Sequence, residues 1–343
     1  MRKILLSMFA AVALIGCNRE NTPITPQEQH AISFGTVDTR AGLSDLQANG
    51  FDVWATVSSI GSTDVSYQPI LTEELVKYVP ASDQWTYANE QLWIPNSIFH
   101  FFAAYPHNIG FEQHTATQNG VNYTAYTLDV TADGSAATED ILVATQATDT
   151  SAQGFDPDDV VNLSFGHLLT KFNLTISQNT SIDSEFEYYV TKVTIEGLMG
   201  QCTYLVMPLN KSFMTAWDIE HATFITLGQD YDSAPVCLRE PDGEGRKSKP
   251  LKVWGSDGIM LIPHDIAENG VKIRVDYLYD VDPNDTDLGQ EKFIEGYIPP
   301  ITWQSSTSIN YNISIANTSL LTFDKPTIEP WGSPQTGGTI IIK

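Results

Sequence analysis

The hydrophobic positions of this chain alternate with polar ones over short segments and rarely recur at helical spacing. In 51–57 the odd positions are apolar and share one face, while Trp54 points to the other face, which we expect to be partly covered. The segment 98–106 is a near-continuous aromatic run ended by a proline. Such a run is typical of a central strand buried on both faces. The pattern predicts strands.

Other segments support the same interpretation. The segments 75–79 and 85–87 flank turn-like residues at 80–83 and predict a hairpin. The segment 271–277 alternates cleanly, as a half-buried strand does. Further strands are predicted at 123–130, 140–144, 163–176, 188–195, 202–206, 223–227, 258–262, 292–297 and 308–315. Apart from a turn near 72–76, no helix is expected. The sequence therefore predicts an all-β protein built of β-sandwiches.

A length of 343 residues allows one large domain or two smaller ones. The Gly-, Pro- and Asp-containing stretch 149–159 is the best candidate for a linker. We therefore expect four parts: a signal peptide at 1–16, a lipidated tether at 17–30, an N-terminal β-sandwich at 31–160, and a C-terminal β-sandwich with a C-terminal tail at 161–343.

The N-terminus carries an export signal. A basic start, Met1-Arg2-Lys3, precedes a short apolar stretch at 4–15, and Gly16-Cys17 closes it. This arrangement resembles the bacterial lipobox, which implies lipidation of Cys17 and attachment to a membrane. The alternative is an ordinary secretory signal with an incidental cysteine. No other stretch is apolar and long enough for a transmembrane helix.

A second processing point follows the β-prone segment 31–37. Thr39 precedes Arg40 and Ala41, so a cut between Arg40 and Ala41 would remove one strand from a folded β-protein. The groove left behind could be used to build polymers. The residues expected on the displaced strand are Ala31, Ile32, Phe34 and Val37.

The C-terminus is apolar and β-prone. An exposed tail of this kind is an aggregation hazard unless it pairs with something. The tail is either the last strand of its own domain or a donor strand for another molecule. The candidate donor residues are Thr339, Ile340, Ile341 and Ile342.

Charge and cysteine content narrow the alternatives. The chain has 18 basic and 42 acidic residues, a net charge of −24, which argues against nucleic-acid binding because phosphate backbones would be repelled. If Cys17 carries lipid, Cys202 and Cys237 remain. They either form a disulfide in an oxidising compartment or stay as two buried free thiols.

Catalytic and metal-binding motifs are missing from the sequence. There is no nucleophile elbow, zinc-protease motif, P-loop or dinucleotide fingerprint, so we expect no enzyme and no cofactor. His100, His107 and His114 are spaced by seven, but a strand and a loop separate the first two. We therefore expect no metal site, and we expect His167 to be a structural, hydrogen-bonding histidine.

In order and spacing, several segments resemble the fimbrillin family, the subunits of type V pili. They are the lipobox at Cys17, the strand and Thr39-Arg40, then 51–55, 93–95, 101–106, 140–144, 165–171, 311–315 and 327–331. The resemblance implies two tandem transthyretin-like β-sandwiches and lipoprotein export to the outer membrane. It also implies cleavage by an Arg-specific protease, after which a strand from another pilus subunit fills the groove.

The resemblance leaves stalk, anchor and tip roles open, and host or bacterial surface ligands are further expected partners. The main alternative is a non-polymerising surface lipoprotein that binds a glycan or a host protein. A hydrolase ranks last, because no carboxylate pair is singled out.

Overall fold

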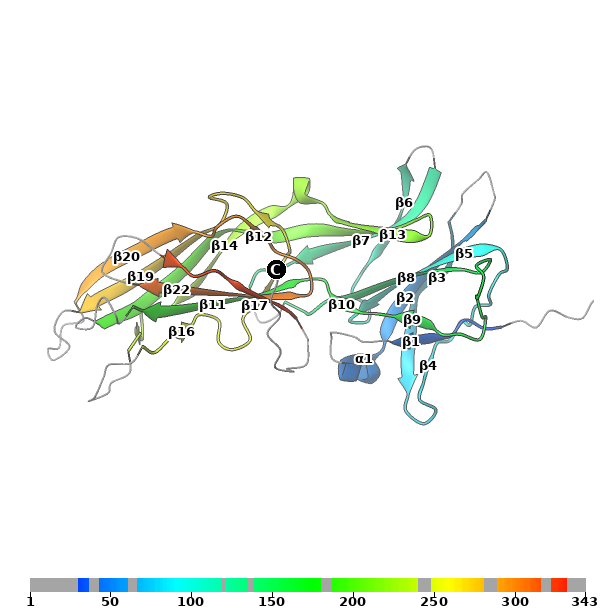
Figure 1. The fold of residues 1–343 in the computed structure, drawn as a ribbon, viewed down its shortest axis with the longest axis horizontal. Coiled ribbons are helices and arrows are strands. Elements are labelled where there is room, and N and C mark those ends of the chain that lie inside the picture. The colour runs from blue at the N-terminus through cyan, green and yellow to red at the C-terminus, as the bar shows by residue number, and fades with distance from the viewer. Residues whose placement is uncertain are drawn as a thin grey trace, which may run out of the picture.

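A computed structural model describes residues 30–36, 43–60, 67–118, 121–134, 138–179, 187–239, 248–280, 289–315 and 322–331. The molecule is elongated, with β-sheets at both ends (Figure 1). The elements up to residue 167 are β1 (Phe34–Thr36), α1 (Leu43–Asn49), β2 (Phe51–Ser59), β3 (Gln68–Val79), β4 (Gln84–Thr86), β5 (Ser97–Tyr105), β6 (Glu112–Gln118), β7 (Val121–Thr131), β8 (Leu142–Asp149), β9 (Val161–Leu163) and β10 (Gly166–His167).

The remaining elements are also almost all strands, so the predicted all-β fold class is confirmed. They are β11 (Thr170–Gln178), β12 (Glu187–Leu209), β13 (Ser212–Trp217), the 3-10 turn η1 (Ile219–His221), β14 (Thr223–Asp230), β15 (Val236–Cys237), β16 (Leu251–Lys252), β17 (Ile259–Leu261), β18 (Asp265–Ile266), β19 (Lys272–Asp280), β20 (Gln290–Tyr297), β21 (Ile301–Thr302), β22 (Thr307–Ile315), β23 (Thr322–Phe323) and β24 (Thr327–Pro330).

The N-terminal half is organised around a six-stranded sheet of order β10-β8-β5-β2-β3-β4. Phe51 and Val53 of β2 face a core that also contains Leu46 of α1. Trp54 faces a second core, shared with β7 and β12. Both faces of this sheet are covered, as the aromatic run in β5 and the position of Trp54 predicted.

The strand β12 connects the two halves. It is 23 residues long and pairs with β14, β15 and β19 along its first part and with β7 and β13 along its second. The sequence predicted two strands here, at 188–195 and 202–206, with Gly197 and Gly200 in the gap between them. Gly197 instead has φ of +88° inside the strand, and a Cβ there would lie 2.2 Å from the carbonyl oxygen of Gly270. Only glycine fits such a close approach.

The C-terminal half is a sandwich. The sheet containing β12, β19 and β20 faces a sheet of order β16-β11-β22-β23, in which β11 and β22 run parallel. Tyr188, Phe172, Trp303 and Tyr311 fill the core between them. The clean alternation predicted for 271–277 is present in β19, where Ile273 and other apolar residues point inward.

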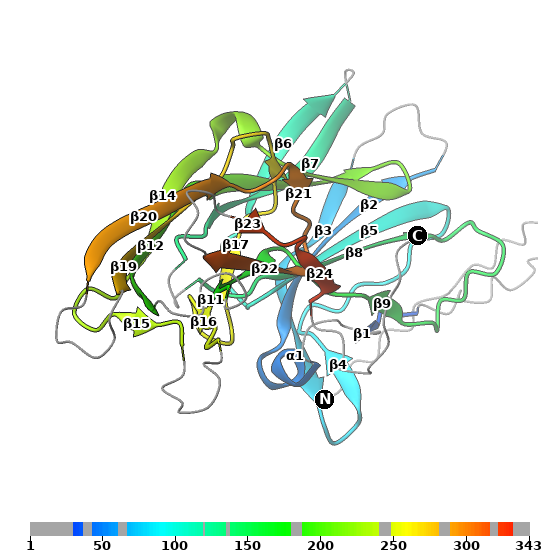
Figure 2. The same ribbon diagram turned by 60° about the vertical axis from the view of Figure 1, so that its left-hand side comes forward.

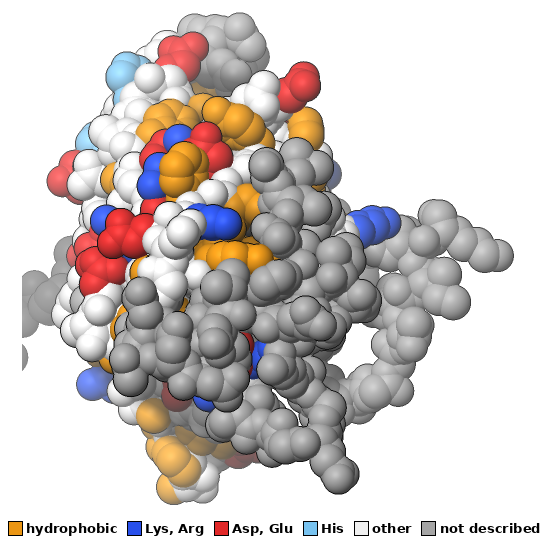
Figure 3. Space-filling view, turned by 90° about the vertical axis from the view of Figure 1, so that its left-hand side faces the viewer, with side chains coloured by type: hydrophobic (Ala, Val, Ile, Leu, Met, Phe, Trp, Pro, Cys, Tyr) orange, Lys and Arg blue, Asp and Glu red, His pale blue; other side chains and the backbone are white. Residues whose placement is uncertain are grey.

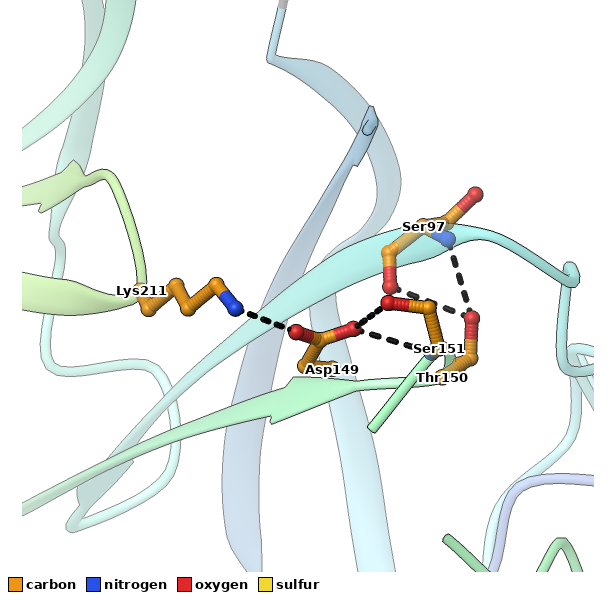
Figure 4. Close-up of polar contacts among 5 residues, drawn as sticks. All are labelled: Ser97, Asp149, Thr150, Ser151 and Lys211. Carbon is orange, nitrogen blue, oxygen red and sulfur yellow. Dashed lines mark hydrogen bonds and ion pairs between the residues drawn. The ribbon is translucent and has the colours of Figure 1, made fainter. Parts of the chain in front are cut away.

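The sheets cross the expected boundary at residue 160. β7 precedes it in the chain but pairs with β12 through Tyr126–Val206 and neighbouring positions. An ion pair adds to this connection: Lys211 Nζ, in the β12–β13 turn, lies 2.5 Å from Asp149 at the end of β8 (Figure 4). Hydrogen bonds from Lys211 and Ser151 lower the pKa of Asp149 to about 2.

Two local expectations are wrong. Residues 43–49 form the helix α1, which the sequence did not predict because Leu46 is its one buried residue and gives no periodic signal. Residues 72–76 belong to β3 and not to a turn. Glu73 has a positive φ of 51° there, next to a shift in the pairing register with β2. This irregularity within β3 explains why the segment did not show the alternation of a regular strand.

Candidate functional site

The segment around β1 lies between two stretches of backbone. On one side Ala31 forms an isolated antiparallel bridge with Leu92. The amide of Ile32 donates to the Gln91 carbonyl at 2.8 Å, and the amide of Trp93 donates to the His30 carbonyl at 3.1 Å. This side of the segment is therefore hydrogen-bonded to the loop before β5.

On the other side, β1 pairs in parallel with β9 through Phe34–Val161 and Thr36–Leu163. The amide of Val161 donates to the Ser33 carbonyl at 2.7 Å. The segment thus occupies a slot with hydrogen-bonding backbone on both sides. Removing it would leave donors and acceptors on both walls without partners.

Two apolar side chains anchor the segment. Ile32 and Phe34 are 2% and 3% exposed. The Phe34 ring lies 5.2 Å from the Tyr87 ring and 5.7 Å from the Phe101 ring. The hydroxyl of Tyr87 also donates to the Ile32 carbonyl at 2.8 Å. Burying two such side chains contributes roughly 3–6 kcal/mol. The slot therefore has two apolar pockets, spaced two residues apart, for these side chains.

A groove of about 700 Å³ runs beside β1. Its other walls come from β4, from residues ahead of β9, and from α1; Figure 2 shows β1, β4, β9 and α1 at one end of the molecule. Trp85 and Tyr78 line it on the β4 side, and Val160 on the β9 side. Val160 is 46% exposed.

The structure places only part of the predicted site. Ala31, Ile32 and Phe34 lie on the segment described above, with Ala31 exposed. Val37 and the cleavage pair Arg40 and Ala41 lie outside the described residues. So do Cys17 and the candidate donor residues Thr339, Ile340, Ile341 and Ile342. In the described part of the chain, no helix is long and apolar enough to cross a membrane.

The last described residue before the predicted donor tail is Trp331. Its ring stacks on His167 at a centroid distance of 3.9 Å, and His167 Nδ1 lies 2.8 Å from Asp140 Oδ1. His167 is thus a structural, hydrogen-bonded histidine, as predicted.

The three evenly spaced histidines occupy different settings. His100 is buried in β5, His107 Nδ1 lies 2.6 Å from Asp52 Oδ1, and His114 Nε2 lies 2.7 Å from Thr127 Oγ1. Within the described ranges, no group of three or more His, Cys, Asp or Glu side chains is placed to hold a metal ion.

Of the two alternatives for the cysteines, the disulfide is wrong: Cys202 and Cys237 are free thiols. Cys237 lies opposite Tyr189, near the start of β12, whereas Cys202 belongs to the far part of the same strand. At the rise of a β-strand this separation is roughly 40 Å, far beyond disulfide reach. Burial raises the pKa of both thiols.

The model of one family, described as fimbrillin-like, matches residues 39–331. The chain belongs to the fimbrillin-like family. The match begins after β1 and ends at Trp331, so it leaves out the predicted displaced strand and the predicted donor tail. No curated protein sequence matches.

Among solved structures, this fimbrillin-like protein is similar to a fimbrial protein from Bacteroides vulgatus, with a TM-score of 0.61 and 17% identity over 88% of this chain and 99% of that one. A candidate cell adhesion protein from Bacteroides uniformis has a TM-score of 0.43 and 14% identity, covering 88% and 98%. The tip fimbrial protein Mfa3 from Porphyromonas gingivalis, with a C-terminal truncation, has a TM-score of 0.34 and 10% identity, over 88% of this chain and 98% of that one. The first of these supports the fold.

Sequence reasoning missed the walls of the slot. Gln91 and Trp93 bind the segment through backbone atoms, and His30 Nδ1 lies 2.7 Å from Asp158 Oδ1 across the groove. Backbone pairing carries no residue-type signal, and 128 positions separate His30 from Asp158. Only the apolar spacing of Ile32 and Phe34 was visible in the sequence.

Proposed function

We propose that this protein is a non-enzymatic structural and adhesive subunit of a cell-surface pilus, assembled by protease-triggered β-strand exchange. In this proposal Cys17 is lipidated and carries the precursor to the outer membrane. An Arg-specific protease then cuts between Arg40 and Ala41, and the segment 31–37 leaves its slot. A strand from a neighbouring subunit takes its place.

The observation that carries the proposal is the two-sided slot around β1. A strand held by backbone bonds on both sides can be replaced by any strand that makes the same bonds, because backbone pairing is independent of sequence. Specificity then comes from the pockets that hold Ile32 and Phe34. The short β1, only three residues long, adds few bonds of its own and is suited to replacement.

The tail has side chains of the right kind for these pockets. Ile340 and Ile342 have the same two-residue spacing as Ile32 and Phe34, so alternate side chains of one strand would enter both pockets. Transfer of a tail from one copy to the slot of the next is a heterologous contact that does not close on itself. Such contacts generate filaments.

The test uses the purified precursor and an Arg-specific protease. We expect SDS-resistant ladders after cleavage, and none from Arg40→Ala, which keeps β1 attached. Ile340→Ser with Ile342→Ser should be cut normally but form no ladder, whereas the matched Ile341→Ser should still polymerise. Clean cutting at Arg40 that yields only monomers would contradict the proposal and favour a non-polymerising surface lipoprotein.

A further inference from the structure

A second groove lies far from β1, on the outer face of the sheet formed by β12, β19 and β20. Its volume is about 620 Å³. Lys, Arg, Asp and Glu side chains are intermixed with hydrophobic ones at this end of the molecule (Figure 3). The strand exchange proposed above does not use this face.

The strand register brings three different kinds of side chain into one row. Asp276 of β19 lies opposite Lys192 of β12 on one side and Phe293 of β20 on the other. In the adjacent row Arg274 lies between Thr194 and Glu295. Since side chains two positions apart share a face, both rows project to the outer face of the sheet.

The aromatic ring in this groove is exposed but held in place. Phe293 is 55% exposed. The guanidinium carbon of Arg274 lies 4.0 Å from its ring centroid. Asp276 fixes that guanidinium by accepting three hydrogen bonds, with Nε–Oδ1 at 3.0 Å, Nε–Oδ2 at 3.1 Å and Nη2–Oδ1 at 2.5 Å. A large exposed aromatic side chain is costly to hydrate, and its fixed orientation lowers the entropy lost on binding.

The lining around this ring offers both donors and acceptors of hydrogen bonds. Lys192 supplies an ammonium donor, Asp232 and Glu291 supply carboxylate acceptors, and Thr194 supplies a hydroxyl. Sugar hydroxyls both donate and accept, and the C–H faces of a sugar ring pack on aromatic rings. The lining therefore matches the surface of a sugar in both its polar and its apolar parts.

We propose that this face is a binding site for an uncharged glycan, with a sugar ring packed at Phe293 and Arg274 and its hydroxyls bonded to the surrounding charged side chains. An acidic glycan fits less well, because carboxylates of the lining and the net charge of −24 would repel it. An extended peptide added at β20 also fits less well. Glu291 and Glu295 are exposed along that strand, and charges of this kind protect a sheet edge from pairing.

The test is a binding screen of the uncleaved, full-length protein on immobilised neutral, sialylated and sulfated glycans. We expect retention by neutral glycans, and at least a tenfold weaker affinity for Phe293→Ala. Arg274→Gln should also weaken binding, because it removes the group that stacks on the ring. Thermal melting of each variant establishes that it is folded. Because no cleavage is involved, the result is independent of polymerisation.

Phe224→Ala is the matched control. Phe224 is 58% exposed, close to the 55% of Phe293, but it lies outside the lining of the groove. We expect its variant to bind as the unmodified protein does. The proposal is overturned if no glycan is retained, or if only sulfated or sialylated glycans bind. It is also overturned if Phe293→Ala and Phe224→Ala behave alike, or if the substitutions weaken the binding of a peptide but not that of a glycan.

Discussion

Trp331 stacks flat on His167: the ring centroids lie 3.9 Å apart and the ring planes are inclined by 6°. The amide of Trp331 donates to the Ser306 carbonyl at 2.8 Å, and Asp140 Oδ1 lies 2.8 Å from Nδ1 of the imidazole. Four segments distant in the sequence, around residues 140, 167, 306 and 331, meet at this stack. It therefore fixes the point from which residues 332–343 continue.

Replacing Trp331 should loosen this point of attachment. Trp331→Ala removes the stacked ring and part of the second core, so we expect the free energy of unfolding to fall by about 2 kcal/mol. Trp331→Phe keeps an aromatic ring and should lose about half as much. Urea denaturation of all three proteins measures the difference. Equal stability of Trp331→Ala and the unmodified protein would contradict a structural role for the stack.

The anchoring of β1 leads to a prediction about local opening. Phe34→Ala empties one pocket of the slot and should destabilise the segment by about 3 kcal/mol, because a buried aromatic side chain is lost. Hydrogen exchange at the Val161 amide, which donates to Ser33, should then accelerate on the order of 100-fold. Thr36→Ala, at the half-buried end of the strand, serves as the control and should change exchange little.

A local pattern of apolar and polar residues predicts strands whose side chains face a defined core. Alternation located β2, β5 and β19 because their side chains face defined cores. It did not show that β7 pairs with β12, since the partners, such as Tyr126 and Val206, lie 70 to 80 positions apart and pair through the backbone. The predicted cleavage and lipidation points, by contrast, rest on sequence motifs alone.

His100 gives a prediction about pH. It is 1% exposed and packs between the rings of Tyr67 and Phe213, each at 5.4 Å. Burial lowers the pKa of His100 to about 4, and the Asn210 backbone opposes this shift only in part. Because the unfolded chain binds the proton more readily, stability is fully present above the unfolded pKa, near 6.5, and is lost as the pH falls toward 4.

The expected loss between these pH values is about 3 kcal/mol, measured as the free energy of unfolding at several pH values. His100→Phe removes the titrating group and should flatten the curve over this range. Thr56 lies opposite His100 in the β2–β5 ladder and is equally buried. Thr56→Val alters the packing but not the titration, so it should keep the slope. If the free energy of unfolding of His100→Phe still falls with pH in this way, other groups cause the pH dependence.

Gly197 tests whether the continuity of β12 depends on a single residue. A Cβ at this position would lie 2.2 Å from the carbonyl oxygen of Gly270, and the φ of +88° is itself unfavourable for a side chain. Gly197→Ala therefore requires backbone movement where β12 passes from one half to the other, and we expect the free energy of unfolding to fall by more than about 3 kcal/mol.

Gly154 provides the control: its φ is +92°, but a Cβ there would meet nothing within 4 Å. Gly154→Ala should cost only about 1 kcal/mol from the backbone conformation. Thermal or urea unfolding compares the two variants. If their losses are equal, the close approach to Gly270 is not what requires glycine at this position.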